Sequence, residues 1–416
     1  MAEEESSGRA VRDAPVGLLR EPKSLLYSVD ARIGGYGRDL NAHESLLLAD
    51  ERGYLGKAIG YDNLQQDISP RYIISLHWHP VRLLSKQPPA LYDDAKKKYV
   101  DWTASRQLKS GNYDLFHGWS GSSLRSLRVA KKRGIPSVLE IPLWHIEKMS
   151  SQLVETSPPD TGKRATETLL KRVFTVTAQQ ILEEYELADR LLVPSKCAAK
   201  SFVEAGVSEE KLFLLGAGVD TELFGNDTSS ELPGAFSAER PMRAVFCGAL
   251  TRRKGVHVLL EAWNKLSLPY AQLTLVGKIC EDIKPSLAQL EGPSINVTGF
   301  LSCVDEVFRQ SDIHIFPSEC EGRPKSVYEA CASGLPQITT FQSGDVVLNE
   351  VNGLIVPPND VLALANAIRR LYNSPWRILQ YGRAARQRAE DELTWDHFRE
   401  RLARAYDLVL RQRSTP

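Results

Sequence analysis

Short apolar runs alternate with helix-like segments along most of this 416-residue chain, and this alternation constrains its fold more than any other feature. Runs such as SLLYSV, YDLFHGW and IPSVLEI are typical of buried strands, while RSLRVAKKRG fits a helix that ends at a glycine. Strands that alternate with helices form a parallel sheet, which needs helices on both faces. The chain is therefore predicted to have an α/β fold.

The alternation occurs twice, on either side of the polar stretch GNDTSSELPGAFSAERPM. Turn residues dominate this stretch, which is therefore predicted to link two Rossmann-like domains. We expect a tail at 1–23, an N-terminal domain at 24–224, the linker at 225–242, a C-terminal domain at 243–388, and a helix at 389–416 that packs back on the N-terminal domain. Such sheets bind ligands at the carboxyl ends of their strands, so the two domains should face each other across a deep cleft.

Composition narrows the class of protein. Basic and acidic residues balance at 52 each, which argues against a global attraction to nucleic acid. No run of about 18 apolar residues occurs, and the acidic, polar start lacks the features of a secretory signal. The six cysteines contain no C-x-x-C pair and are expected to be reduced thiols. Together these features predict a cytoplasmic protein without a zinc site.

Two glutamates in SECEGRPKSVYEACASGLP form the strongest candidate site. If a helix begins near Lys325, Glu321 lies in the preceding loop and Glu329 in the second turn, so both side chains can face one cleft. The N–H groups and the dipole at the start of that helix favour a phosphate, while carboxylates accept hydrogen bonds from sugar hydroxyls. Taken alone, the spacing is better explained by two solvated surface charges, and the surrounding motifs decide between the interpretations.

A cationic turn lies in the second candidate segment, FCGALTRRKGVHVLLEA. A strand is expected to end at Gly248 and a helix to begin near Gly255, which holds Arg253 and Lys254 beside the helix N-terminus. Cations there oppose the helix dipole, and an anion bound between them would remove the conflict. A solvated basic turn is the alternative interpretation.

Two further motifs carry less information. The turn GGYGRD after the first strand lets the backbone approach a ligand, but it is not the G-x-G-x-x-G fingerprint of dinucleotide-binding enzymes. The segment LHWHP places His77 and His79 on one face of a strand, as in a metal-binding pair. No third ligand is evident in the sequence, so a structural role is the simpler interpretation of these histidines.

These segments, in this order and spacing, resemble the GT-B fold glycosyltransferases of family 4. The resemblance rests on VFCGALTRRKGVHVLLEA, LTLVG, SECEGRPKSVYEACASGLPQITT and VNGLIVPPND in the second half, and on ADRLLVPS and LLGAGVDTELF in the first. It extends over about residues 24–410. It implies a retaining enzyme of the hexosyltransferase type, which moves a sugar from a nucleotide-sugar donor to a hydroxyl acceptor without a metal or other cofactor.

The resemblance also implies roles for particular residues. Lys254 would bind the donor diphosphate, Glu329 the ribose hydroxyls, and Glu321, the first glutamate of the E-x7-E motif, the sugar hydroxyls. The other implied donor-binding residues surround the same cleft: Gly34, Gly35, Gly248, Gly299, Leu301, Arg323, Lys325, Ser326 and Val327. Among them, the two N-terminal glycines would close over the phosphates, and the segment from Val297 to Leu301 would lie beside the base.

Several positions depart from the family pattern. Ala249 stands where an arginine is common, and Arg253 is predicted to replace that arginine. Pro142 stands where a histidine often meets the donor sugar, and His145 is a candidate replacement. The usual E-G-F-G ends here in Arg323 and a proline, which removes a backbone donor and adds charge near the sugar.

The N-terminal side of the cleft is predicted from the segment FHGW. His117 is a candidate catalytic residue, with hydrogen bonding inside the fold as the alternative. Trp119 is a candidate for stacking on a sugar ring, or for packing. The basic stretches DAKKKYVDW and RVAKKRG are candidate contacts to the anionic inner face of a membrane or to a lipid-diphosphate acceptor, although solvated helix faces explain them more simply.

The sequence thus predicts a retaining glycosyltransferase with a nucleotide-sugar donor and a saccharide, glycolipid or other hydroxyl acceptor, active in polysaccharide or glycoconjugate assembly. Stabilisation of the leaving diphosphate by positive charge would be the main catalytic contribution. A non-catalytic nucleotide-sugar-binding protein and a nucleotide-sugar epimerase are the alternatives, because a fold alone does not establish chemistry. The donor sugar, its base, the acceptor and the oligomeric state do not follow from the sequence.

Overall fold

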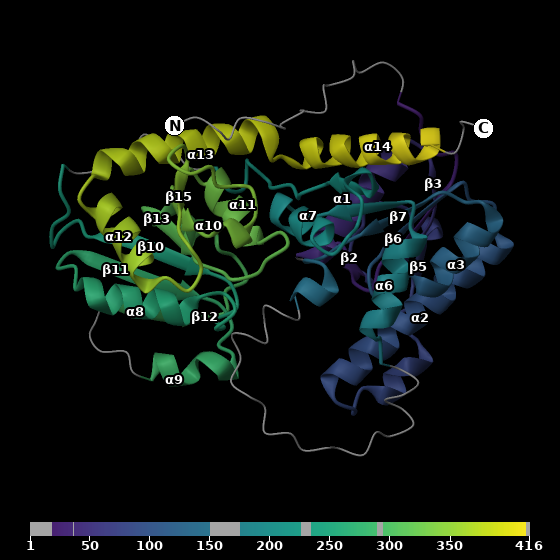
Figure 1. Ribbon diagram of the computed structural model, residues 1–416, viewed down its shortest axis with the longest axis horizontal. Coiled ribbons are helices and arrows are strands. Elements are labelled where there is room, and N and C mark those ends of the chain that lie inside the picture. Colours follow the sequence, from purple (N-terminus) through teal and green to yellow (C-terminus); the bar gives the residue numbers. More distant parts are fainter. Residues whose placement is uncertain (1–18, 36, 150–174, 226–233, 289–293, 413–416) are drawn as a thin grey trace.

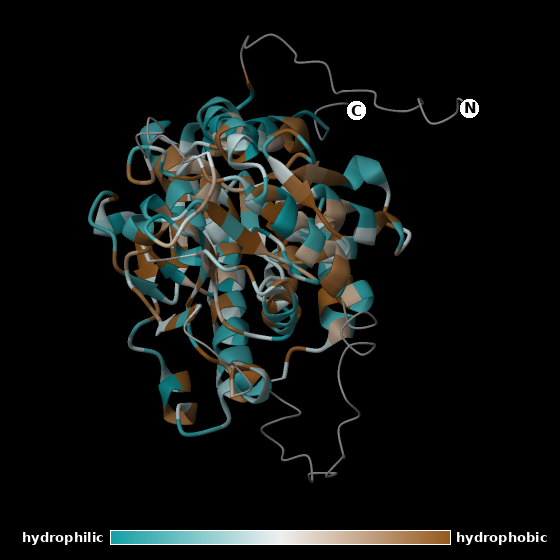
Figure 2. Cartoon of the chain, turned by 90° about the vertical axis from the view of Figure 1, so that its left-hand side faces the viewer, coloured by the Kyte–Doolittle hydropathy of each residue, from teal (hydrophilic) through white to brown (hydrophobic). Residues whose placement is uncertain are grey.

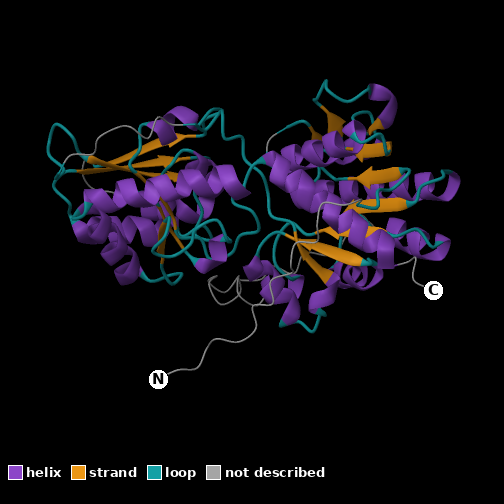
Figure 3. Cartoon of the chain, turned by 90° about the horizontal axis from the view of Figure 1, so that it is seen from above, coloured by secondary structure: helices purple, strands orange, loops and turns teal. Residues whose placement is uncertain are grey.

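The computed structural model describes residues 19–35, 37–149, 175–225, 234–288 and 294–412. Two sheets dominate it, one in each half of the chain, and helices flank both of them (Figure 3). The strands pair in parallel throughout both sheets. The predicted α/β class with two Rossmann-like domains is therefore confirmed. The predicted N-terminal tail falls mostly on residues 1–18, which lie outside the described residues.

The N-terminal sheet has the strand order β5-β3-β1-β6-β7-β8-β9. Its strands are β1 (Leu25–Ser28), β3 (Leu55–Gly60), β5 (Ile73–Ser75), β6 (Leu115–Trp119), β7 (Ser137–Glu140), β8 (Arg190–Val193) and β9 (Leu212–Leu214). Its helices are α1 (Arg38–Glu51), α2 (Pro89–Ser110), α3 (Leu124–Arg133), α6 (Ala178–Leu187) and α7 (Lys196–Val203). A small parallel pair, β2 (Arg32–Ile33) and β4 (Asp62–Asn63), lies beside the sheet.

The C-terminal sheet has the order β12-β11-β10-β13-β14-β15. Its strands are β10 (Met242–Cys247), β11 (Ala271–Val276), β12 (Ile295–Gly299), β13 (Ile313–Phe316), β14 (Gln337–Thr339) and β15 (Gly353–Ile355). Its helices are α8 (Val256–Leu266), α9 (Lys284–Leu287), α10 (Asp305–Arg309), α11 (Lys325–Ala332), α12 (Val361–Tyr372) and α13 (Pro375–Glu392). The central strands β10 (MRAVFC) and β13 (IHIF) are mostly apolar and, apart from Arg243, buried, because helices cover both faces of the sheet.

The two cores form where the apolar faces of strands and helices meet. Every residue of β1, β6, β7 and β13 is buried, as expected for central strands of a covered parallel sheet. Hydrophobic residues concentrate on the inner strands in Figure 2, while the outer faces of the helices are more hydrophilic. α3 ends as predicted, because Gly134 takes the left-handed conformation and its N–H bonds back to the last turn.

Helix α14 (Trp395–Gln412) joins the two halves. After α13 crosses the C-terminal sheet, α14 runs along the N-terminal half, as Figure 1 shows. Phe398, Leu402 and Tyr406 are buried in the same cluster as strands β1 and β6. Arg401 donates to the carbonyl oxygens of Leu215 and Ala217 in the crossover between the sheets, at 2.7 and 2.9 Å. No helix in the described part of the chain is long and apolar enough to cross a bilayer.

His314 of β13 makes the stability of the C-terminal half depend on pH. Its ring is fully buried, and Nδ1 lies 2.9 Å from Oε1 of Gln337 on β14. Burial lowers the pKa of His314 to about 4, the Gln337 hydrogen bond opposes this shift, and Lys254 lowers the pKa further. In the unfolded chain, His314 binds a proton below its ordinary pKa of 6.5. In the folded chain, the His314 ring stays neutral down to a pH of about 4.

The contribution of His314 to stability should therefore be full above pH 6.5 and should fall by roughly 3 kcal/mol as the pH drops to 4. Urea unfolding midpoints measured across this range check the prediction. His314→Gln should remove this contribution, so that the difference in stability between the wild type and the variant changes across the window. Equal slopes for the wild type and His314→Gln would contradict the assignment.

Candidate active site

The cationic turn predicted after β10 lies at the carboxyl edge of the C-terminal sheet. Gly255 sits at the start of α8 with φ +70°, and a Cβ there would lie 2.1 Å from the carbonyl oxygen of Pro317. Glycine is required at this position because the turn and the loop after β13 touch through their backbones. Glu319 N–H donates to the carbonyl of Arg253 at 2.9 Å and ties the two loops together. The chain thereby brings the predicted cations next to the predicted glutamate.

Glu321 lies between two cations of this turn. Its Oε1 is 2.9 Å from Arg253 Nη1 and 3.2 Å from Lys254 Nζ, and it accepts a hydrogen bond from Ser318 Oγ at 3.2 Å. Arg253 also donates to the carbonyl of Cys320. Lys254 Nζ lies 4.8 Å from the ring centroid of Phe316, a cation–π contact that fixes its position. This cluster holds two positive charges and one negative charge at the carboxyl edge of the C-terminal sheet.

The N-terminus of α11 lies beyond this cluster, and no side chain caps it. Pro324 occupies the N-cap position, and the first turn contains Lys325, Ser326 and Val327. Glu329 is fully buried one turn later, and Lys325 Nζ is 3.4 Å from its Oε1. Burial lowers the pKa of Lys325, and Glu329 opposes the shift. A helix start that no side chain caps favours a bound anion, as the sequence analysis expected.

Glycines line the same edge of the C-terminal sheet. Gly248 follows β10 with its Cα close to Lys254, so that a Cβ there would lie 3.4 Å from Nζ. Gly277 N–H donates to the carbonyl of Gly299 at 2.8 Å, which aligns the ends of β11 and β12. Leu301 follows on the same side and packs against the C-terminal core. The residues predicted to face the nucleotide therefore share one edge of the sheet.

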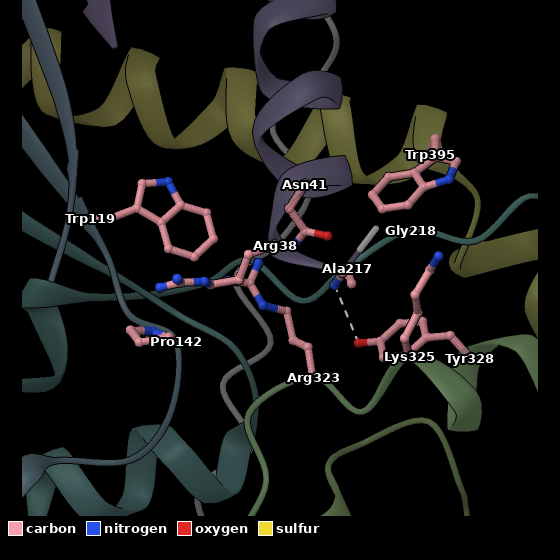
Figure 4. Close-up of a pocket in the computed structure, with 11 residues that line it drawn as sticks. Arg38, Asn41, Trp119, Pro142, Ala217, Gly218, Arg323, Lys325, Tyr328 and Trp395 are labelled. Atoms are coloured by element: carbon pink, nitrogen blue, oxygen red, sulfur yellow. Dashed lines mark hydrogen bonds between the residues drawn. The ribbon is translucent and has the colours of Figure 1, made fainter. Parts of the chain in front are cut away.

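A pocket of about 100 Å³ lies between the two halves of the chain (Figure 4). Both halves contribute to its lining, which comprises Gly37, Arg38, Asn41, Trp119, Pro142, Ala217, Gly218, Arg323, Lys325, Tyr328 and Trp395. The guanidinium groups of Arg38 and Arg323 lie 5.8 and 5.7 Å from the ring centroid of Trp119. Lys325 is the third cation of this small pocket, and each of the three is paired with a carboxylate outside the lining: Arg38 with Asp30, Arg323 with Glu140, and Lys325 with Glu329.

Arg323 crosses the cleft into the N-terminal half. Its Nη2 lies 2.6 Å from Oε1 of Glu140 at the end of β7, and its Nη1 donates to the carbonyl of Gly216 at 2.8 Å. Burial alone would raise the pKa of Glu140, but the charge of Arg323 and the contact with His117 outweigh it and lower the pKa. The structure thus uses Arg323 as an interdomain ion-pair partner.

His117 lies behind this ion pair and does not line the pocket. Nε2 is 3.2 Å from Oε2 of Glu140, and Nδ1 is 2.8 Å from the hydroxyl of Tyr406 on α14. The ring is fully buried and meets Tyr27 edge-on at 4.6 Å. Trp119, two residues on, lines the pocket and donates to the Tyr27 hydroxyl at 2.8 Å. The geometry fits the alternative stated for His117, hydrogen bonding within the fold.

The segment after β7 closes against Glu321 and Gly322. Trp144 Nε1 donates to the carbonyl of Glu321 at 2.9 Å, and a Cβ on Gly322 would lie 2.0 Å from the carbonyl oxygen of Pro142. His145 points elsewhere, since its ring packs against Tyr185 and Phe202 in the N-terminal core. The structure therefore places Pro142 and Trp144, and not His145, opposite the glutamate.

The glycines of the first turn have separate local roles. A Cβ on Gly34 would lie 2.5 Å from Cβ of Gln65, and one on Gly35 would lie 2.2 Å from Oδ2 of Asp39. Gly37, which the sequence analysis did not select, is the glycine that lines the pocket. The sequence analysis also missed four other residues that line the pocket: Arg38, Asn41, Tyr328 and Trp395. Arg38 and Asn41 could have been found, because they are polar residues that closely follow GGYG.

The described residues form neither a metal site nor a disulfide. No three of their histidine, cysteine, aspartate or glutamate side chains converge as a metal site. His77 Nδ1 lies 3.1 Å from Asp62, and His79 Nε2 lies 2.9 Å from the Tyr61 hydroxyl, so each ring has its own partner. All six cysteines belong to this part of the chain and are free thiols.

Comparisons with known proteins agree with this geometry. A family model described as "Glycosyl transferases group 1" matches residues 241–374. The O-antigen chain mannosyltransferase C of Escherichia coli is 27% identical over 177 residues, which are 41% of this chain and 47% of that protein. The amylovoran biosynthesis glycosyltransferase AmsK of Erwinia amylovora is 26% identical over 242 residues, 52% of this chain and 58% of that protein. The chain spans about half the length of these curated relatives.

Solved structures match over nearly the whole chain. Sucrose-phosphate synthase from Thermosynechococcus elongatus superposes with a TM-score of 0.65 at 20% identity, covering 95% of this chain and 99% of that one. WaaG, a glycosyltransferase involved in lipopolysaccharide biosynthesis, gives 0.64 at 15% identity with coverages of 92% and 99%. Anabaena Alr3699/HepE in complex with UDP gives 0.61 at 17% identity, again with 92% and 99%. The chain has the GT-B fold.

Proposed function

We propose that the chain is a glycosyltransferase of the retaining, family 4-like type, which moves a sugar from a nucleotide-sugar donor to a hydroxyl of a saccharide acceptor. The observation that carries the proposal is the convergence of Arg253, Lys254 and Glu321 beside the N-terminus of α11, on the cleft between the two sheets. The match to the glycosyltransferase group 1 model covers the segment that contains all of these residues. The curated relatives, by their names, act in the synthesis of polysaccharides, which suggests the same role here.

The contacts of Glu321 suggest how a donor would bind. Its carboxylate pairs with both Arg253 and Lys254, at 2.9 and 3.2 Å, and leaves one of the two positive charges unbalanced. A donor diphosphate carries more negative charge than the carboxylate and would take over both cations, assisted by the N–H groups at the start of α11. Glu321 would then be released to accept hydrogen bonds from the sugar hydroxyls.

The same cations would assist the reaction. Bond cleavage between the sugar and the diphosphate leaves an additional negative charge on the leaving oxygen, and fixed positive groups stabilise that charge in the transition state. Glu329, fully buried in α11, is proposed to hold the ribose. We propose a reaction without a covalent sugar intermediate, in which the leaving diphosphate helps to deprotonate the acceptor hydroxyl.

One observation favours a second candidate, a nucleotide-sugar-binding protein without transferase activity. Pro142 and Trp144 pack directly on the backbone of Glu321 and Gly322, on the side where the donor sugar is expected. A sugar can enter there only if this contact opens. If it never opens, the chain binds nucleotides without turnover.

A thermal-shift screen of nucleotide sugars tests donor binding. The matched donor at about 100 times its Kd should stabilise the folded chain by about 2.7 kcal/mol and raise its Tm. Lys254→Ala should weaken donor binding roughly 10–100-fold, because one charge-assisted contact is lost. Lys265→Ala, on the exposed face of α8, is the matched control and should bind as the wild type does.

Products from a labelled donor then separate the candidates. Sugar on an acceptor, with its anomeric configuration retained in the NMR spectrum, supports the proposed function. Isomerised donor indicates an epimerase, and a bound but unchanged donor indicates a binding protein. Equal donor affinities for the wild type and Lys254→Ala would place the donor elsewhere.

A further inference from the structure

An exposed tryptophan stands at the edge of the N-terminal sheet and takes no part in the site described above. Trp78, in the LHWHP segment after β5, is 85% exposed, and Leu83 in the same connection is 87% exposed. Large apolar side chains are rarely this exposed together unless they meet a ligand or a partner. The connection leads from β5 into α2 through a short 3₁₀ helix, Pro80–Leu84.

Neighbouring side chains fix the orientation of the Trp78 ring. The guanidinium of Arg82 lies 5.0 Å from the ring centroid, and the His77 ring meets it nearly at right angles at 5.1 Å. Nδ1 of His77 is 3.1 Å from Asp62, and Arg82 donates to the His77 carbonyl at 3.4 Å. A ring held in place in this way loses little conformational entropy when a ligand stacks on it.

A polar group of aromatic side chains lies next to Trp78. The hydroxyls of Tyr61 and Tyr92 are 2.8 Å apart, and Lys96 Nζ lies 4.7 and 4.9 Å from their ring centroids. His79 Nε2 is 2.9 Å from the Tyr61 hydroxyl. Burial and the Tyr92 contact raise the pKa of Tyr61, so its hydroxyl remains a donor at neutral pH. We call Tyr61, His77, Trp78, Arg82, Tyr92 and Lys96 the aromatic platform.

The platform continues the edge on which the candidate active site lies. Tyr61 follows β3 and Trp78 follows β5, while the pocket lies at the ends of β1, β6 and β7. The order β5-β3-β1 places the platform one and two strands from β1, which is roughly 10 Å at the spacing of a sheet. A ligand that reaches from the pocket to Trp78 has to be longer than one sugar ring.

We propose that the aromatic platform binds an acceptor of at least two sugar units, with an outer sugar stacked on Trp78 while the reacting sugar lies at the pocket. This inference rests on the glycosyltransferase function proposed above and specifies its acceptor. A pyranose ring has an apolar C–H face and a rim of hydroxyls, so it suits a flat apolar ring flanked by a guanidinium and an imidazole, with further polar groups at Tyr61, Tyr92 and Lys96 along the same edge.

The surrounding charges favour a saccharide over a lipid surface. Segments that bind anionic membranes carry clusters of 4–8 basic residues. Here acidic residues lie among the basic ones: Asp62 contacts His77, and Asp93 lies 2.5 Å from Lys96. A mixed rim around a single exposed ring suits hydroxyls better than a sheet of anionic headgroups.

Binding to a glycan array tests the proposal, with neutral, uronate-containing and phosphorylated saccharides from single sugars to hexasaccharides. Trp78→Ala should bind the longer saccharides at least about tenfold more weakly than the wild type, and Trp78→Phe should recover much of the loss. Trp376→Ala is the matched control, since Trp376 is 57% exposed on α13 and has Arg377 4.4 Å from its ring centroid. It should bind as the wild type does.

Unchanged glycan binding by Trp78→Ala would overturn the proposal, and so would the absence of any saccharide bound by the wild type. Loss of binding to vesicles of phosphatidylcholine and phosphatidylglycerol in Trp78→Ala, with glycan binding intact, would also overturn it and assign the ring to a membrane. The donor-induced rise in Tm, measured on the same samples, reports the donor site alone. Its absence in the wild type would contradict the proposed function, whereas its presence without glycan binding would contradict only the platform.

Discussion

The Glu321→Ala variant is expected to lose roughly 10²–10³-fold in kcat/KM for sugar transfer, yet to retain its affinity for the nucleoside diphosphate of the matched donor. The carboxylate lies 2.9 Å from Arg253 and 3.2 Å from Lys254. Its removal frees both cations for the diphosphate, while the sugar loses the group that is proposed to hold its hydroxyls. Initial rates and calorimetry measure the two quantities separately.

The split between rate and affinity is what identifies the role of Glu321. Glu281→Ala, which removes a carboxylate that is 87% exposed in the same half of the chain, is the control and should change neither quantity. Transfer at the wild-type rate by Glu321→Ala would remove Glu321 from the active site. A parallel loss of diphosphate affinity would indicate that the carboxylate only supports the cationic turn.

Local sequence patterns were sufficient to predict the cationic side of the site. Arg253 and Lys254 follow a strand and precede a helix, and Glu321 follows another strand of the same sheet, so their positions depend on strand ends that apolar runs predict well. The pocket contacts across the cleft could not be predicted in this way. Glu140 and Trp395 reach the site only because two halves of the chain pack together, and no local pattern encodes that packing.

The sequence analysis did not predict strand β3 or helix α13, because their local patterns are not those of a typical strand or helix. β3 reads LGKAIG, and its glycines and lysine hide the strand pattern. α13 reads PWRILQYGRAARQRAEDE, and it packs through small residues such as Gly382, Ala385 and Ala389. A Cβ on Gly382 would lie 2.4 Å from the Gly334 carbonyl, so close backbone contact replaces the usual stripe of large apolar side chains. Periodicity in large apolar residues is therefore a poor guide to this helix.

Arg323→Met is expected to destabilise the chain by about 3–5 kcal/mol, because it leaves the Glu140 carboxylate buried without its ion-pair partner. Glu140 is fully buried, Arg323 is 7% exposed at its side chain, and the two lie 2.6 Å apart. Removal of the guanidinium also ends its hydrogen bond to Gly216 in the crossover between the sheets. Thermal unfolding followed by circular dichroism should show the loss as a lower Tm.

Two further variants show whether the stability lost in Arg323→Met comes from the unpaired charge of Glu140. Glu140→Gln together with Arg323→Met should be more stable than Arg323→Met alone, because the double variant buries no charge. Arg128→Ala breaks a pair of similar length, 2.7 Å from Glu183, but at the surface, and should leave the Tm nearly unchanged. If Arg323→Met were as mild as Arg128→Ala, solvent would have to reach Glu140, and the contact between the two halves would be open in solution. That result would also favour transferase activity over simple nucleotide binding, since the sugar would then have a route past Pro142.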